Sequence, residues 1–323
     1  MSAPPSPPSS VPWTPRVGTD RRDVLDLAAS LAADLRASPD RKVLDEVGAF
    51  TMGVPEELGG GGADPGTTLL ALQRLATGSA AATLPVVHAH AASLLGEVPD
   101  GPVLVLPARG VVAEHGDGGW TLSGTIARAD LESPQCKVVL AERERAFAFT
   151  ADEAVMTPLG ARTGLPGPAS VRLTLDAVTA RRLPAADTAP AMRLLLLGHA
   201  AVAAGVHEAA QSAARRYTAE RVQFGVPIAA HDAVRAELDG LADRLSTTIA
   251  GLVTLAEEPT ASAPARSLLR RAVRDCVAAC RIALALHGGY GYLTEFPVAG
   301  LLRDAVSLRA LAACLDHEEN GHA

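Results

Sequence analysis

The sequence predicts an α+β fold in three parts: an N-terminal helical domain, a central β-sheet domain and a C-terminal four-helix bundle. Two changes of hydrophobic pattern along the 323 residues predict it. Apolar residues recur at helical spacing in the first part, alternate in short runs in the second, and return to long helical stretches in the third. The composition agrees, because 48% of the residues are hydrophobic but only 3% are aromatic, and a core of Ala and Leu favours helices. We place the domains at 21–101, 102–188 and 189–323, after a tail over 1–20.

The N-terminal part predicts a tail followed by helices. "MSAPPSPPSSVPWTP" is rich in Pro and Ser, which is typical of disorder, and it lacks the basic start and apolar core of a signal peptide. "RRDVLDLAASLAADLRAS" carries apolar residues at helical spacing. "VLDEVGAFTMGVPEELGGGG" then indicates a helix, a short extended piece and a glycine-rich loop, and two more helices follow.

The central and C-terminal parts differ in the length of their elements. Strand-like runs such as "GPVLVLP" and "KVVLAERERAFAFTA" are separated by Gly, Pro and Asp, and "HGDGGWTLSG" predicts a hairpin. The last part predicts four long helices, at roughly 190–219, 231–257, 263–287 and 297–315, which is the pattern of a four-helix bundle.

Composition excludes several classes of function. The net charge of −7 argues against a nucleic-acid partner, because phosphate neutralisation needs a basic face. No run of about 18 apolar residues appears, so no membrane span is predicted. Of the four cysteines, Cys276 and Cys280 are one helical turn apart, but no second ligand pair has suitable spacing. We therefore expect no metal site, and four buried thiols in a reducing cytoplasm.

Two C-terminal motifs carry a family resemblance. "ARRYTAERVQFGVPIAAHDAVRAELDGLADRL" holds an Arg-x-x-Phe-Gly turn between two bundle helices, and "ALHGGYGYLTEFPVAGLLRDA" holds a glycine-rich break. Both resemble motifs of the acyl-CoA dehydrogenase family, as do "VGAFTMGVPEELGGGG" and "GWTLSGT" nearer the N-terminus. The resemblance spans about residues 20 to 310, and it implies an FAD-dependent oxidoreductase of the acyl-CoA class.

The resemblance implies where FAD binds. In this family FAD lies extended between the β domain and the bundle, and a neighbouring subunit holds its adenine-diphosphate end. Gly288 and Gly289 match the positions that meet the diphosphate, where glycine permits close backbone approach. Arg221 matches the residue that neutralises it, and Gln223 and Phe224 lie in the same turn, with Phe224 packing on the nucleotide. A Gly-Gly pair alone is more often a break between bundle helices.

The usual catalytic glutamate is missing. Removing the proton next to a thioester carbonyl requires a nearby carboxylate. The family places this glutamate nine residues beyond the arginine that matches Arg303, where this chain has Ala312. Some members take the base from the first bundle helix, at the place of Leu195. Glu318 and Glu319 follow too late and are expected to be solvated tail charges.

Other candidates for a base are less specific. Where the family has a tryptophan and a threonine against the flavin ring, this chain has Arg128 and Asp130. Asp130 is a candidate replacement acid, or a loop charge. His199 and His287 are further candidates, although a lone histidine in an apolar helix is more often a core group.

Three hypotheses follow. The first is that this chain is the base-lacking subunit of a hetero-oligomeric FAD-dependent acyl-CoA dehydrogenase, which oxidises an acyl thioester to its 2,3-enoyl form. In it, the partner chain supplies the base and the flavin-ring pocket. The second is a self-sufficient flavoenzyme with a non-standard base, working as a homo-oligomer. The third is a flavin-free scaffold used for binding, or for non-redox chemistry on a thioester or polyketide-like intermediate.

Overall fold

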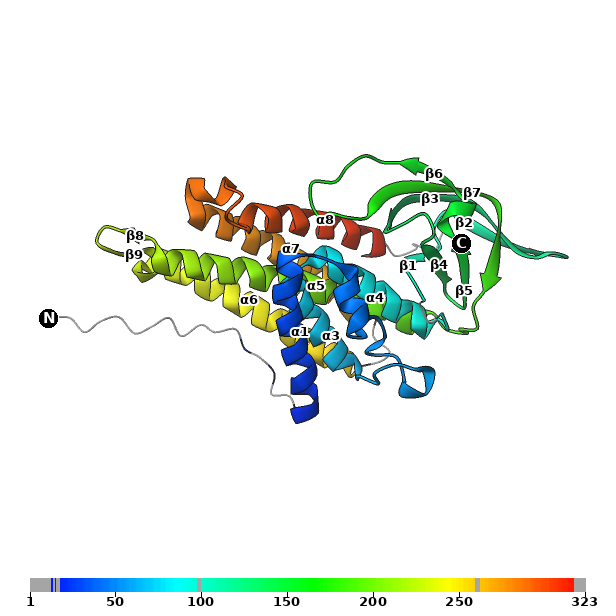
Figure 1. Ribbon diagram of the computed structural model, residues 1–323, viewed down its shortest axis with the longest axis horizontal. Helices are drawn as coiled ribbons and strands as arrows, with labels where there is room; N and C mark the ends of the chain where they lie inside the picture. Colours follow the sequence, from blue (N-terminus) through cyan, green and yellow to red (C-terminus); the bar gives the residue numbers. More distant parts are fainter. Residues whose placement is uncertain (1–12, 14, 16–17, 98–99, 259–261, 317–323) are drawn as a thin grey trace.

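The computed structural model describes residues 13, 15, 18–97, 100–258 and 262–316. It has the predicted order of helices, sheet and helices (Figure 1). Most of the predicted tail over 1–20 lies outside the described residues. The two glutamates at 318 and 319 also lie outside them. The α-helices of the first part are α1 (Thr19–Ala37), α2 (Arg41–Glu46), α3 (Pro65–Ala76) and α4 (Ala80–Leu94).

Local sequence explains where α3 and α4 begin. Asp64 is the N-cap of α3, and its side chain accepts hydrogen bonds from the backbone N–H groups of Gly66 and Thr67 at 3.0 and 3.1 Å. Ser79 caps α4 in the same way by accepting from the Ala82 N–H at 3.2 Å. Nearly every residue of α4 is buried, because the helix lies between α5 and the sheet.

The sheet is mixed and strongly curved. Its strand order is β1-β4-β5-β7-β3-β2, and β6 pairs with β7 as well. The predicted hairpin is confirmed, since β2 pairs antiparallel with β3. The β1–β4 pairing is parallel, which the sequence did not predict. The strands are β1 (Val103–Pro107), β2 (Val111–Gly116), β3 (Gly119–Leu131), β4 (Lys137–Glu142), β5 (Arg145–Thr150), β6 (Val155–Pro158) and β7 (Ala169–Arg182).

Both faces of β1, β4 and β5 are buried. On β4, Val139 faces the helical core while Val138 and Leu140 face a second core enclosed by β3 and β7. On β5, Ala148 faces the helices and Phe147 faces the second core. Strands buried on both faces are apolar throughout rather than alternating. The sheet is thereby fixed against α4.

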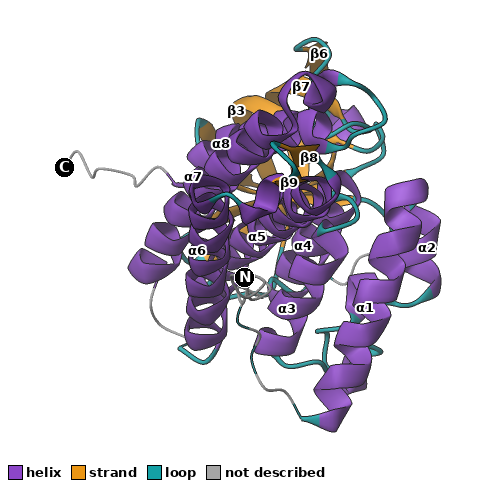
Figure 2. Cartoon of the chain, turned by 90° about the vertical axis from the view of Figure 1, so that its left-hand side faces the viewer, coloured by secondary structure: helices purple, strands orange, loops and turns teal. Residues whose placement is uncertain are grey.

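The four predicted bundle helices are confirmed. They are α5 (Ala189–Glu220), α6 (Asp232–Ala256), α7 (Ser262–His287) and α8 (Val298–Asp316). Figure 2 looks onto the end of the bundle that carries β8 and β9, with the sheet behind it and α1 and α2 to one side.

α5 is the central helix of the molecule. It packs against all the other bundle helices and against α3 and α4. Its small residues allow close approach: a Cβ on Gly205 would lie 2.4 Å from the carbonyl oxygen of Gln73 in α3. By length and hydropathy α5 could also cross a membrane, but 78% of its most apolar window is buried inside this fold. Its apolar composition is accounted for by that burial.

The cysteines differ in one respect from the prediction. Cys136, Cys276 and Cys280 are buried free thiols, as predicted. The prediction is wrong for Cys314, which is exposed because it lies outside the buried face of α8.

Candidate functional site

Two regions contain the residues singled out by the sequence. The first is the end of the bundle away from the sheet, which we call the distal end (Figure 1). There the chain leaves α5, makes the short ribbon of β8 (Val222–Gln223) and β9 (Val226–Pro227), and enters α6. The second is a cavity where α4, α5 and α8 meet the sheet.

The two C-terminal motifs meet at the distal end. α7 ends at His287 and continues as a 3-10 turn over Gly288–Tyr292. The guanidinium carbon of Arg221 lies 5.7 Å from the ring centroid of Tyr290 in this turn. Within the described residues, Arg221 has no carboxylate partner for its side chain. Its charge therefore remains available to a group from outside the chain.

The ribbon at the distal end presents Phe224 to solvent. Phe224 is 92% exposed and has a positive φ of 52°, and Gly225 follows with a φ of 84°. A left-handed conformation at a phenylalanine is unusual. In the part of the chain that the structure describes, the ring has one aromatic neighbour, His231, with ring centroids 6.1 Å apart. Gln223 is exposed in the same ribbon.

The two glycines after His287 differ. Gly288 has a φ of 58°, so the backbone at the end of α7 requires glycine there. Gly289 has no such φ, and an added Cβ would meet nothing within 4 Å. None of the described residues therefore requires glycine at 289, and its backbone is open to a group from outside.

His287 has a packing role. Its ring is buried, stacks on Tyr217 at 4.2 Å and meets the edge of Phe296 at 5.3 Å. Its Nδ1–H donates to the carbonyl of Ala283 at 2.7 Å. This geometry fixes the glycine-rich turn and leaves His287 away from the cavity.

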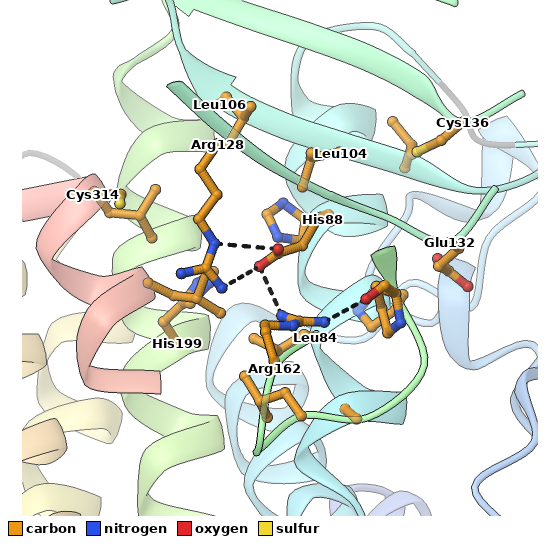
Figure 3. A pocket seen from close by; sticks show the side chains of 18 residues that line it. Leu84, His88, Leu104, Leu106, Arg128, Glu132, Cys136, Arg162, His199 and Cys314 are labelled. Carbon is orange, nitrogen blue, oxygen red and sulfur yellow. Dashed lines mark hydrogen bonds and ion pairs between the residues drawn. The ribbon is translucent and has the colours of Figure 1, made fainter. Parts of the chain in front are cut away.

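The cavity has a volume of about 80 Å³ and a mainly apolar lining (Figure 3). α4 contributes Leu84 and His88, α5 contributes His199, and α8 contributes Leu311. β1 and β3 close the opposite side. The candidate base positions adjoin it: Ala312 follows Leu311 on α8 and is buried, and Leu195 is buried one turn before His199.

Asp130 lies in the wall of this cavity and is fully engaged. Arg128 donates to its carboxylate from Nε and Nη2 at 3.3 and 3.2 Å, and Arg162 donates from Nη1 at 2.8 Å. The Ser170 hydroxyl donates to it at 2.5 Å. The other carboxylate that lines the cavity, Glu132, is paired with Arg41 at 3.0 Å. Both carboxylates are therefore ion-paired.

Arg162 belongs to a segment that the sequence did not single out. Residues 159–168, which we call the strap, connect β6 to β7 and lie along α8. The Leu165 N–H donates to Oδ1 of Asp304 at 2.6 Å. A Cβ on Gly164 would lie 2.2 Å from the carbonyl oxygen of Arg303. Arg162 reaches Asp130 on β3 from the β6–β7 connection, 32 residues further along the chain, so no local pattern in the sequence could have revealed this contact.

Two buried histidines, His88 and His199, lie next to each other in the lining of the cavity. The rings of His88 and His199 are edge to face, with centroids 5.5 Å apart. Burial lowers the pKa of His88 to about 3, assisted by the nearby His199, and lowers the pKa of His199 to about 4. Both rings are therefore neutral at pH 7. Cys136 in the same lining also stays neutral, because burial raises its pKa to about 12.

Comparison with known proteins gives the family. The family model for the C-terminal domain of acyl-CoA dehydrogenases matches residues 192–312. An acyl-CoA dehydrogenase of Bacillus subtilis (strain 168) is 35% identical over 113 residues, which are 34% of this chain and 30% of the relative. Over residues 192–312 the chain belongs to the acyl-CoA dehydrogenase family.

Likeness of fold to acyl-CoA dehydrogenases extends beyond the bundle. The butyryl-CoA dehydrogenase of Megasphaera elsdenii superposes with a TM-score of 0.76 and 19% identity, over 94% of this chain and 98% of that one. A glutaryl-CoA dehydrogenase of Mycobacterium smegmatis, solved in complex with FADH2, gives a TM-score of 0.75 and 17% identity over 92% and 91%. The sequence match thus spans under a third of the curated relative, whereas the fold is shared along nearly the whole chain.

The residues of this chain fit one end of FAD better than the other. At the distal end, an unpaired arginine and an open glycine backbone suit a diphosphate. The cavity of about 80 Å³ is far smaller than the 300–1,000 Å³ typical of ligand pockets. It has no room for a flavin ring system. In the described residues no group of three His, Cys, Asp or Glu side chains is placed to hold a metal ion.

Proposed function

We propose that this chain is the base-lacking subunit of a hetero-oligomeric, FAD-dependent acyl-CoA dehydrogenase. One observation carries the proposal: both carboxylates that line the cavity are ion-paired, and the two candidate base positions, Ala312 and Leu195, are buried and apolar. A carboxylate with two arginines and a hydroxyl on its oxygens is poorly suited to remove a proton. The base for α-proton removal would then come from the partner chain.

The cofactor assignment follows the same division. Arg221 would pair with the diphosphate of FAD, with Gly289 allowing close backbone approach and Phe224 contacting the nucleotide from the β8–β9 ribbon. Gln223 and Gly288 would complete this surface. The flavin ring would lie in the partner, because the cavity beside the candidate base positions is too small for it. When bound, FAD supplies the acceptor for the hydride from the β-carbon of the acyl thioester.

The role of this chain would be to hold and orient one end of the cofactor. The guanidinium of Arg221 offers paired donors that match phosphate oxygens. The side chain is already positioned over Tyr290, so less conformational entropy is lost on binding. We place the reaction, oxidation of an acyl-CoA to the 2,3-enoyl thioester, in the cytoplasm and in lipid metabolism.

The test is FAD retention with and without a partner. The chain is purified alone and co-expressed with an acyl-CoA dehydrogenase encoded beside it, and flavin absorbance is measured after gel filtration. We expect little FAD on the lone chain and stoichiometric FAD on the complex. Stoichiometric FAD on the lone chain would instead favour a self-sufficient flavoenzyme, with His199 as the first base to examine.

The matched variants are Arg221→Ala and Arg216→Ala, both of which alter exposed arginines near the end of α5. Charge-assisted hydrogen bonds to an arginine contribute about 1.5–3 kcal/mol each. Arg221→Ala should therefore weaken FAD binding by the complex about tenfold or more, since about 1.4 kcal/mol corresponds to a factor of ten. Arg216→Ala should leave it unchanged. Full FAD affinity and acyl-CoA oxidation in Arg221→Ala would favour the flavin-free scaffold.

A further inference from the structure

The cavity contains a hydrogen-bonding pair for which the proposed function has no use. It is closed on one side by the strap, through the Leu165 N–H to Asp304 bond and the close contact of Gly164 with Arg303. Apart from the ionic cluster around Asp130, Glu132, the two histidines and the thiols of Cys136 and Cys314, its lining is aliphatic. An enclosed apolar cavity with a few converging polar groups is the usual form of a small-molecule site.

The ionic cluster does not favour a charged ligand. Asp130 is shared by Arg128, Arg162 and the Ser170 hydroxyl, and Arg162 also donates to the carbonyl of Pro168 at 2.8 Å. An anionic ligand would have to displace Asp130 from two arginines. A cation would be repelled by those arginines. A neutral ligand disturbs none of these bonds.

The backbone partners of the two histidines fix opposite tautomers. The Nδ1 of His88 accepts a hydrogen bond from the Val105 N–H at 3.2 Å, so a neutral ring carries its proton on Nε2. The Nδ1 of His199 lies 2.8 Å from the carbonyl of Leu195, which can only accept, so this ring carries its proton on Nδ1. The Nε2 of His88 is therefore a donor and the Nε2 of His199 is an acceptor. Among the described residues neither Nε2 has a hydrogen-bond partner.

A donor and an acceptor on adjacent rings match a hydroxyl group. A hydroxyl accepts one hydrogen bond and donates another, whereas a ketone or an ester carbonyl only accepts. The size is also restrictive, because a cavity of about 150 Å³ holds one benzene, and this one has about 80 Å³. In proportion, the aliphatic part of the ligand should have only about three carbons.

We propose that this cavity binds a short, neutral aliphatic molecule or side group bearing one hydroxyl, which donates to Nε2 of His199 and accepts from Nε2–H of His88. The site is formed by this chain alone and does not depend on FAD or on the proposed partner. Its failure and the failure of the FAD proposal are therefore separate results.

The experiment measures binding of 2-propanol and of acetone to the purified chain by calorimetry. The two probes have nearly the same shape, but only the alcohol can use His199. We expect the alcohol to bind about threefold to tenfold more tightly, the usual effect of one net hydrogen bond. His199→Phe should abolish this preference. Leu311→Phe should fill the cavity and abolish binding of both probes.

The matched control is His90→Phe. His90 is a buried histidine on the same helix as His88, but its Nε2 is bonded to the Ala49 carbonyl at 3.0 Å, and it does not line the cavity. It should keep the preference for the alcohol. Absence of binding by either probe to the wild type, or a preference that persists in His199→Phe, overturns the proposal.

A measurement on the wild type covers the case in which His199→Phe does not fold. NMR of the histidine ring nitrogens should show His88 protonated on Nε2 and His199 on Nδ1, and 2-propanol should shift the Nε2 signals of both. Equal tautomers, or no shift at saturating alcohol, would also overturn the proposal.

Discussion

At the scale of single residues, Gly288 and Gly289 are glycine for different reasons. Gly288 has a left-handed φ of 58° where the backbone turns out of α7, so the fold itself favours glycine at this position. At Gly289 the fold does not require glycine, since an added Cβ would have no described atom within 4 Å. The motif "HGGYGY" therefore combines a helix ending at Gly288 with an open backbone at Gly289, where the proposed contact with the diphosphate would lie.

This difference gives a paired prediction. Gly288→Ala should lower the free energy of unfolding by about 1–2 kcal/mol, the cost of a left-handed conformation at a residue with a Cβ. Gly289→Ala should leave the stability of the lone chain unchanged, but weaken FAD retention by the complex. Urea unfolding of the two variants measures the first effect, and flavin absorbance the second. Equal stability of the two variants would contradict the assigned turn, and full FAD retention in Gly289→Ala would contradict its role at the diphosphate.

At the scale of elements, the junction of the strap with α8 depends on Asp304. Burial raises the pKa of this carboxyl above its usual 3.8, although the Leu165 N–H and the nearby arginines favour the charged form. When the folded pKa of an acid is raised, the unfolded state loses its proton first as pH rises. Stability is therefore lost as pH rises from about 3.8 through the folded value. At neutral pH the buried charge on Asp304 therefore lowers the free energy of unfolding.

Asp304→Asn and Asp304→Ala separate the charge from the hydrogen bond. Asn keeps an acceptor for the Leu165 N–H and removes the buried charge, so this variant should be at least as stable as the wild type at pH 7, with its advantage growing as pH rises from 4. Ala removes the acceptor and should be about 1 kcal/mol less stable than Asn at every pH. Urea unfolding between pH 4 and 8 measures both effects. An Asn variant that loses stability relative to the wild type as pH rises would refute the predicted direction of the pH dependence.

The elements themselves were predictable where the sequence pattern is long. The four bundle helices follow from helical periodicity sustained over many turns, and the hairpin follows from its glycine-rich turn. The parallel pairing of β1 with β4 was not predictable, because continuous apolar runs do not specify a neighbour. The motif residues at the distal end could be located, whereas the cavity could not. Its side chains come from α4, α5, α8, β3 and the strap, and no local spacing joins them.

At the scale of the whole molecule, buried histidines predict acid sensitivity. Burial lowers the pKa values of four histidines from 6.5 to about 3 for His88 and about 4 for His90, His199 and His207. The unfolded state then takes up protons first, so stability is full above pH 6.5 and is lost as pH falls toward the folded values. Each group contributes about 1.4 kcal/mol per pH unit in that window.

Four such groups would remove roughly 5 kcal/mol per pH unit, against a typical total of about 5–15 kcal/mol. We therefore expect unfolding near pH 5. Urea unfolding at pH 7.5, 6.5 and 5.5 measures the slope, and His90→Phe should reduce it by about a quarter relative to the wild type. His115→Gln, at an exposed position, is the control and should not change it. Constant stability down to pH 4.5 would contradict the assigned burial.

The distal end also bears on assembly, because it exposes an apolar patch. The patch consists of Val222, Phe224, Val226, Tyr290, Tyr292 and Leu293. Phe224 and Tyr292 are 92% and 75% exposed, which is unusual for aromatic side chains. Clustered exposed apolar side chains of this kind mark an interaction surface, and one of them, Tyr290, lies 5.7 Å from the guanidinium carbon of Arg221. Cover from a second chain would therefore bury the patch and the proposed diphosphate site together.

The chain should accordingly be more than a 33.1 kDa monomer, either alone or with its partner. A buried aromatic side chain contributes on the order of 2 kcal/mol or more by removal of apolar area from water. Phe224→Ser with Tyr292→Ser should therefore weaken association at least about tenfold. Val112→Ser is the matched control, since Val112 is equally apolar and 61% exposed but lies on β2. Sedimentation velocity across a concentration series measures the dissociation constant of each. If the double variant associates as tightly as the wild type and the Val112 control, the contact lies elsewhere, and Arg221 then faces solvent rather than a shared cofactor.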